Sequence, residues 1–71
     1  MLKIIKETLE QKMNGCKTIK SEVQSECANQ EQFDLLRREA QIHGWDFRDD
    51  ARYQFTVRKD EKIYCFRLLK N

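Results

Sequence analysis

The sequence predicts a small α+β protein with a single domain, residues 1–71, in which N-terminal helices pack on a C-terminal antiparallel β-hairpin. Two patterns predict this class. Apolar residues before Gly44 recur at helical spacing, whereas those after Arg52 alternate with polar residues, as in a strand with one buried face. A chain of 71 residues with no proline and two glycines also favours one thin core and tight connections.

The first segment, residues 2–13, is expected to form an amphipathic helix. Four apolar residues recur at helical spacing, with charged residues between them: Leu2, Ile5, Leu9 and Met13. The dipeptide Asn14-Gly15 is a suitable helix end, because glycine adopts the left-handed cap conformation at no steric cost.

The second segment, residues 17–27, is open to two interpretations. Ile19, Val23 and Cys27 are spaced by four, which favours a second, short helix, and Ser21 with Gln24 would form a capping box at its start. The alternative is a strand from Lys17 to Cys27. In that case the fold would be a helix lying on a small antiparallel sheet.

The third helix is expected to begin after Asn29, which forms a capping box with Gln32, and to run to about His43 before Gly44. It has two apolar stripes, half a turn apart. The core stripe consists of Phe33, Leu36 and Ala40, and the second stripe consists of Leu35 and Ile42. Either the helix lies between two other elements, or Leu35 and Ile42 form an interface with a partner chain, which would include a homodimer.

The last segment, residues 52–69, predicts the β-hairpin. Closing the turn at Asp60-Glu61 pairs three apolar residues on each strand: Val57 with Tyr64, Phe55 with Phe66, and Tyr53 with Leu68. Before the hairpin, Trp45 and Phe47 would add a short third strand, and residues 48–51 would turn the chain. An isolated hairpin is marginal in water, so its apolar face requires a covering element.

Charge is distributed unevenly along the chain. The hairpin segment, residues 52–71, has six basic and two acidic side chains, whereas residues 29–51 have three basic and six acidic ones. The N-terminal apolar run is too short for a signal peptide or a membrane span, which favours a cytoplasmic protein. Three cysteines without a CxxC spacing, Cys16, Cys27 and Cys65, agree with a reducing compartment.

No pattern in the sequence predicts an enzyme, a cofactor or a small-molecule substrate. His43 and the three cysteines do not have the spacing of zinc ligands, so we expect no metal. Cys65 has no identifiable base, and Asp49-Asp50 is expected to be a solvated pair in a turn. There is no glycine-rich phosphate loop.

The order of the predicted elements resembles a winged-helix (helix-turn-helix) DNA-binding domain. The resemblance is carried by Ser21-Glu22-Val23 with Cys27 as a second helix, by Asn29 and Phe33 at the start of a third, and by Gly44-Trp45 before the hairpin. In that family the third helix enters the DNA major groove and the hairpin, or wing, contacts the backbone. The resemblance therefore implies base contacts by Gln30, Arg38 and Gln41, and phosphate contacts by Arg58, Lys59 and Lys62.

The sequence thus favours a small, non-enzymatic regulatory module that is a winged-helix-like, DNA-associated regulator. The net acidic third helix opposes this, since phosphate neutralisation normally dominates DNA affinity. The alternative is a small phage-type inhibitor or adaptor that acts by protein–protein contact on a host or defence complex. Its partner would be a host protein instead of duplex DNA, and neither hypothesis involves a membrane.

Overall fold

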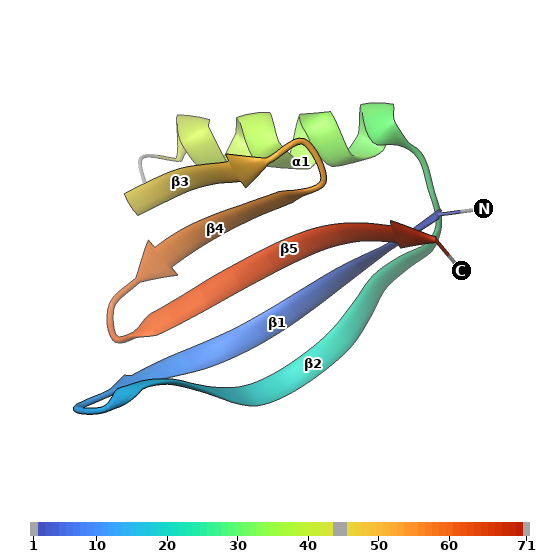
Figure 1. Cartoon of the computed structure of the whole chain (residues 1–71). Helices are drawn as coiled ribbons and strands as arrows, with labels where there is room; N and C mark the ends of the chain where they lie inside the picture. The colour runs from blue at the N-terminus through green and yellow to red at the C-terminus, as the bar shows by residue number, and fades with distance from the viewer. Residues whose placement is uncertain (1, 44–45, 71) are drawn as a thin grey trace.

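The chain folds into a five-stranded antiparallel sheet with one helix against one of its faces (Figure 1). The computed structural model describes residues 2–43 and 46–70. The elements in chain order are β1 (Leu2–Lys12), β2 (Gly15–Ala28), α1 (Gln30–Ile42), β3 (Asp46–Ala51), β4 (Gln54–Lys59) and β5 (Lys62–Lys70). The order across the sheet is β2-β1-β5-β4-β3, so the first and last strands of the chain lie side by side.

Residues 2–12 form strand β1, and the expected helix over residues 2–13 is wrong. β1 pairs with β2 on one side and with β5 on the other. Its even-numbered residues face α1, and Ile4 and Thr8 are buried there. The apolar residues Leu2, Ile5 and Leu9 have helical spacing, but pairing along both edges of β1 decides in favour of a strand. Asn14-Gly15 does not cap a helix but belongs to the β1–β2 turn, where Gly15 has a φ of 124°.

Residues 17–27 lie within strand β2, so the strand alternative is correct and the second helix is wrong. Three register shifts interrupt the β1–β2 pairing, and one of them lies between the pairs Ile4–Ser25 and Ile5–Val23. Each shift places an extra residue in β2, as in a β-bulge. The bulges let this edge strand follow a longer path than β1.

The helix expected from Asn29 onward is confirmed, and so is its capping box. The Asn29 side-chain oxygen accepts a hydrogen bond from the Gln32 backbone N–H at 2.8 Å, and the Gln32 side chain accepts one from the Asn29 N–H at 3.2 Å. The helix ends at Ile42, with His43 as its C-cap. The expected roles of Gly44 and Trp45 lie outside the described residues.

The β4–β5 hairpin has the predicted register, with Phe55 opposite Phe66 and Val57 opposite Tyr64. Asp60 in the turn adopts a φ of 58°, which aspartate tolerates better than most residues. The Tyr53 carbonyl accepts a hydrogen bond from the Leu68 N–H at 2.9 Å, but the Tyr53 side chain is exposed. The buried face of β4 therefore ends at Phe55.

The segment before the β4–β5 hairpin was expected to contain a short strand followed by a turn, and only the strand is confirmed. The short third strand exists as β3, and Phe47 packs against the core. Residues 48–51 also belong to β3, so they do not form a turn. β3 pairs with β4 through Phe47–Val57 and Asp49–Phe55, which makes it the second edge of the sheet.

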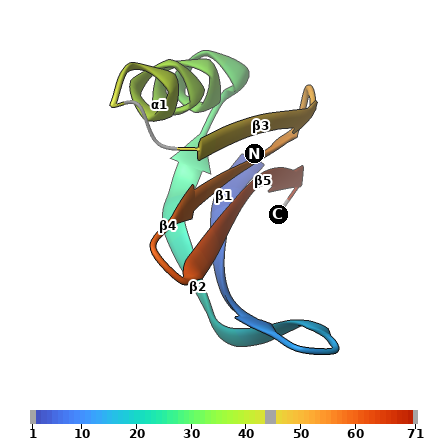
Figure 2. The same ribbon diagram turned by 90° about the vertical axis from the view of Figure 1, so that its left-hand side faces the viewer.

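The core lies between α1 and the sheet and is mainly aromatic. The Phe55 ring is 5.2 Å from the Phe33 ring of α1 and 5.0 Å from the Phe66 ring of β5, between centroids. Seen from the side, α1 lies near β3 and β4, whereas the tip of the β1–β2 hairpin curves away from it (Figure 2). The expected winged-helix-like arrangement of N-terminal helices on a hairpin is therefore wrong, because both N-terminal elements are strands.

Candidate binding surface

Because α1 lies toward one edge of the sheet, a groove remains open between the helix and strands β1, β2 and β5. Its volume is about 370 Å³. The floor is formed by Phe55, Tyr64 and Phe66, and Leu36 and Ala40 of α1 form one wall. Grooves of this size with an apolar lining are typical of binding sites in proteins.

The polar groups of the groove lie around its apolar floor. Lys6 of β1, Lys59 of β4 and Glu39 of α1 all contribute to the lining. The ammonium group of Lys6 lies 4.8 Å from the centroid of the Tyr64 ring, a cation–π contact that holds this lysine over the floor. The groove thus combines apolar side chains with groups of both charges.

The second apolar stripe of α1 faces outward. The side chains of Leu35 and Ile42 are 57% and 73% exposed. In the described part of the chain no element lies over them, so α1 is not placed between two elements. On a helix with 100° per residue, Leu35 and Ile42 lie about 40° and 60° from Glu39, which lines the groove. We call Leu35, Ile42 and the groove the apolar surface.

The three residues predicted to contact DNA bases differ in their surroundings. Gln30 is engaged within the molecule, because its Nε2 donates to Asp34 at 3.0 Å and to the Arg52 carbonyl at 3.4 Å. Arg38 and Gln41 are exposed on the helix. The structure therefore leaves two of the three side chains available to a ligand.

The predicted phosphate-contacting residues are divided between the two faces of the sheet. Lys59 and Lys62 lie opposite each other at the β4–β5 turn and share the side that carries α1. Arg58 lies on the opposite side, across from Ile63 and next to Asp46 of β3. Only the two lysines are brought together.

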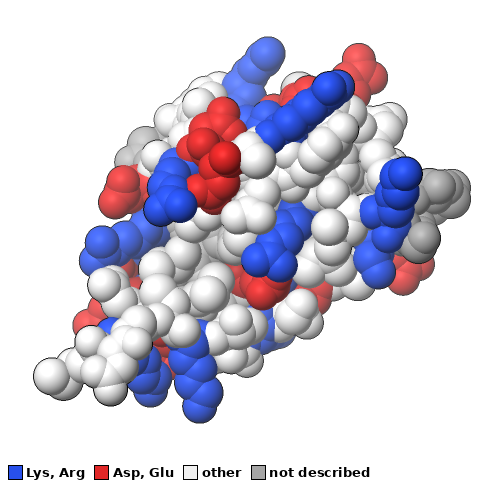
Figure 3. All heavy atoms as spheres, in the orientation of Figure 1, with Lys and Arg blue, Asp and Glu red and all other residues white. Residues whose placement is uncertain are grey.

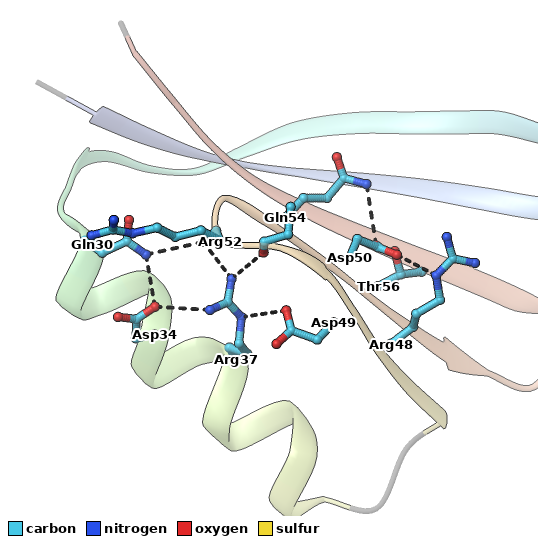
Figure 4. Close-up of polar contacts among 10 residues, drawn as sticks. Gln30, Asp34, Arg37, Arg48, Asp49, Asp50, Arg52, Gln54 and Thr56 are labelled. Carbon is cyan, nitrogen blue, oxygen red and sulfur yellow. Dashed lines mark hydrogen bonds and ion pairs between the residues drawn. The ribbon is translucent and has the colours of Figure 1, made fainter.

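Arg37, which belongs to no sequence motif, joins α1 to the β3–β4 connection (Figure 4). Its Nη2 donates to the carbonyls of Ala51 and Arg52, at 2.9 and 2.7 Å. Its Nε forms an ion pair with Asp49 at 3.5 Å but makes no hydrogen bond. The side chain is only 17% exposed. The one signal for it in the sequence is its position four residues after Phe33, at the border of the core stripe.

The two adjacent aspartates of β3 point to opposite faces and serve different partners (Figure 4). Asp50 accepts hydrogen bonds from the Thr56 hydroxyl, from Arg48 Nε at 2.5 Å and from Gln54 Nε2 at 3.5 Å. Its side chain is 10% exposed. Burial alone would raise the pKa of Asp50, but these hydrogen bonds outweigh it and lower the pKa below its usual range. Asp49 instead pairs with Arg37, so the two carboxylates do not share a site.

The thiols with a described environment lie away from the groove. Cys16 is exposed at the tip of the β1–β2 hairpin, and Cys65 is buried on the side of β5 opposite to α1. Over residues 2–43 and 46–70, His, Cys, Asp and Glu do not gather into groups of three or more that would hold a metal ion. Nor does this part of the chain contain a helix that is long and apolar enough to span a membrane.

In the described residues, the apolar surface joins an open groove to exposed aliphatic side chains, and two polar clusters stabilise the fold. Comparison of the chain with protein-family models, with curated proteins and with solved structures gives no match.

Proposed function

We propose that the protein is a non-enzymatic binding module that acts by contact with another protein through the apolar surface. The observation that carries this proposal is the exposure of Leu35 and Ile42 beside an open groove with an aromatic floor. Large aliphatic side chains exposed singly need no explanation, but two of them next to an apolar groove form a contiguous patch. Such patches mark interaction sites.

The energetic gain from covering this surface is substantial for a small protein. Fully burying a leucine or isoleucine side chain contributes about 1.5–3 kcal/mol, and more than half of each is still exposed here. A partner helix lying across α1 could cover Leu35 and Ile42 while one of its side chains enters the groove. Recognition of an amphipathic helix by an apolar groove follows the same geometry.

The hypothesis of a DNA-associated regulator loses its main support, because it depended on an order of elements that this chain lacks. The α1 surface also retains acidic residues, Glu31, Asp34 and Glu39, which oppose the approach of phosphate. We therefore favour the role of an inhibitor or adaptor that binds a host protein. The free thiols Cys16 and Cys65 are consistent with action in the cytoplasm.

Photo-crosslinking from the groove tests this function. A photoreactive phenylalanine replaces Glu39, which lines the groove, and the protein is irradiated in extract of its source cells. We expect a defined adduct that survives nuclease and is destroyed by protease. An adduct destroyed by nuclease would instead identify a nucleic-acid partner.

Matched variants show whether the adduct depends on the apolar surface. Leu35→Arg with Ile42→Arg should abolish it. The control is Leu69→Arg, which changes an exposed leucine on the opposite side of the sheet and should leave the adduct intact. Equal crosslinking in both variants would contradict the proposed function.

A further inference from the structure

Lysines collect on the side of the sheet that carries α1, in the region that the helix leaves uncovered. Side chains alternate along a strand, so residues that pair across strands share a face. Tyr64 and Phe66 line the groove on this side, and their partners on β1 are Thr8 and Lys6. The same pairing places seven lysines on this face, of which Lys70 lies at the far end, opposite Leu2. The other six are Lys6, Lys12, Lys17, Lys20, Lys59 and Lys62.

The lysines are concentrated at the end of the sheet where the strands turn. One row across four strands reads Lys17, Glu10, Lys62 and Lys59. The next row places Lys20 beside Thr8 and Tyr64. Three carboxylates lie in the rows that contain the lysines: Glu10, Glu22 and Asp49. Glu22 pairs with Lys20 at 3.6 Å, and Asp49 pairs with Arg37 at 3.5 Å. We call the six lysines the lysine face.

The opposite face of the sheet has no such excess. Arg67 pairs with Glu7 at 2.6 Å, and Arg48 pairs with Asp50. Figure 3 views the molecule from that side, and acidic and basic groups are interspersed over it. The net charge of +2 does not reveal this difference in charge between the two faces. It arises from the alternation of residues along β1 and β5 and from the bulges of β2.

We infer that the segment bound in the groove is acidic as well as apolar: a partner peptide or helix whose carboxylates meet the lysine face while an aliphatic or aromatic side chain enters the groove. This inference rests on the proposed function and specifies its partner. Lys6 and Lys59 lie both in the groove lining and on the lysine face, so the apolar and the basic regions are continuous. A field of one sign beside an apolar site favours a partner of opposite charge and accelerates its association.

Single-stranded nucleic acid is the other polyanion to consider, since aromatic side chains next to lysines can stack bases. The aromatic rings here are poorly placed for stacking. Phe55 and Phe66 are buried in the core, and Lys6 lies over the ring of Tyr64. Glu39 in the groove lining would also face the phosphates. Protein carboxylates therefore suit this surface better.

Two synthetic peptides of equal length test the inference on the full chain. One contains glutamates with leucine at positions three and four apart, so that the leucines share a helix face. The other has glutamine in place of every glutamate. A single-stranded oligonucleotide with the same number of negative charges is the third probe. Binding of each fluorescently labelled probe is measured by anisotropy at low and at physiological salt.

We expect the glutamate peptide to bind most tightly and to weaken as salt is raised. Neutralising Lys12, Lys17 and Lys62 to glutamine should lower its affinity by about tenfold, because each exposed charge pair contributes a few-fold. The matched control neutralises Lys3, Arg58 and Lys70, which lie on the opposite face or at the far end of the sheet. That control should change the affinity less than about twofold, since distant exposed charges are screened.

The outcomes separate the two proposals. Equal binding of the glutamate and glutamine peptides, lost in the Leu35→Arg and Ile42→Arg variant, would preserve the proposed function and overturn the acidic partner. Tighter binding of the oligonucleotide than of either peptide would overturn the inference in favour of nucleic acid. No binding of any probe would also overturn it.

Discussion

The two faces of the sheet are made by the same strands but stabilise the molecule in different ways. The face toward α1 buries aromatic rings, with Phe55 and Phe66 stacked at 5.0 Å. The opposite face is held by charge pairs and hydrogen bonds, among them Arg67–Glu7 and the Asp50 cluster. Apolar burial stabilises without regard to direction, whereas polar networks fix geometry. We therefore expect large losses of stability from substitutions on the first face and smaller, pH-dependent ones on the second.

The largest effect should come from the aromatic core. Phe55→Ala removes a fully buried ring that contacts the rings of Phe33, Phe47 and Phe66, and it should lower the free energy of unfolding by about 3–5 kcal/mol. Because the free energy of unfolding of small domains is only about 5–15 kcal/mol, the variant should be partly unfolded at 25 °C. Urea unfolding followed by circular dichroism measures this.

A milder substitution serves as a control for the core and shows whether the two faces differ. Cys65→Ala changes a buried residue of β5 on the face opposite to α1 and should cost much less, about 1 kcal/mol. Equal losses from Phe55→Ala and Cys65→Ala would contradict the assignment of the core to the α1 side.

The next substitution concerns Arg37, which connects α1 to the end of β3 by hydrogen bonds. These are polar contacts on the side of the sheet that otherwise buries aromatic rings. Arg37→Met keeps much of the aliphatic stem over the Phe33 ring but removes the donors to the Ala51 and Arg52 carbonyls. We expect the free energy of unfolding to fall by about 1–3 kcal/mol, because the two carbonyls would be left without a hydrogen-bond donor. The matched control is Arg38→Met, an exposed arginine one position along, which should change stability by less than about 0.5 kcal/mol.

The elements that could be predicted from the sequence are those fixed by local signals. The β4–β5 register follows from alternating apolar residues on both strands around one short turn, and α1 follows from a capping box and a core stripe. Both depend on contacts between residues near one another in the chain. The side chains of Lys59 and Lys62 could likewise be placed together from the turn alone.

The N-terminal half could not be predicted, because its structure depends on distant partners. The residues of β1 fit a helix about as well as a strand, and the decision comes from pairing with β5 at the other end of the chain. Asn14-Gly15 ends helices and also forms hairpin turns, so it does not discriminate. The groove depends on the same long-range pairing, since Lys6 reaches Phe66 and Tyr64 only once β1 lies beside β5. Arg37 was missed because its acceptors are backbone carbonyls, which leave no mark in a sequence.

A pH titration examines the polar face through Asp50. The pKa of this carboxyl is lowered in the folded protein, so its contribution to stability is present above the unfolded pKa of about 3.9 and is lost as the pH falls through the folded value. We expect the unfolding free energy of the wild type to fall below about pH 4 more steeply than that of Asp50→Asn. The titration is followed by urea unfolding at each pH, and parallel profiles for the two proteins would contradict the role of the Asp50 cluster. Glu61→Gln, in the exposed β4–β5 turn, is the matched control for the removal of one carboxylate.

The smallest effect on stability is expected on the outer stripe of α1, which is the part of the helix proposed to contact another protein. Leu35→Glu replaces an exposed side chain, so the free energy of unfolding should change by less than about 0.5 kcal/mol. Sedimentation at micromolar concentration shows whether the stripe instead contacts a second copy of the chain. We expect a monomer for both proteins, because a contact through one 13-residue helix would bury less than the ~800 Å² per partner of a stable interface. A wild-type dimer that Leu35→Glu dissociates would mean that α1 binds its own copy, and the apolar surface would then be engaged before any other protein could reach it.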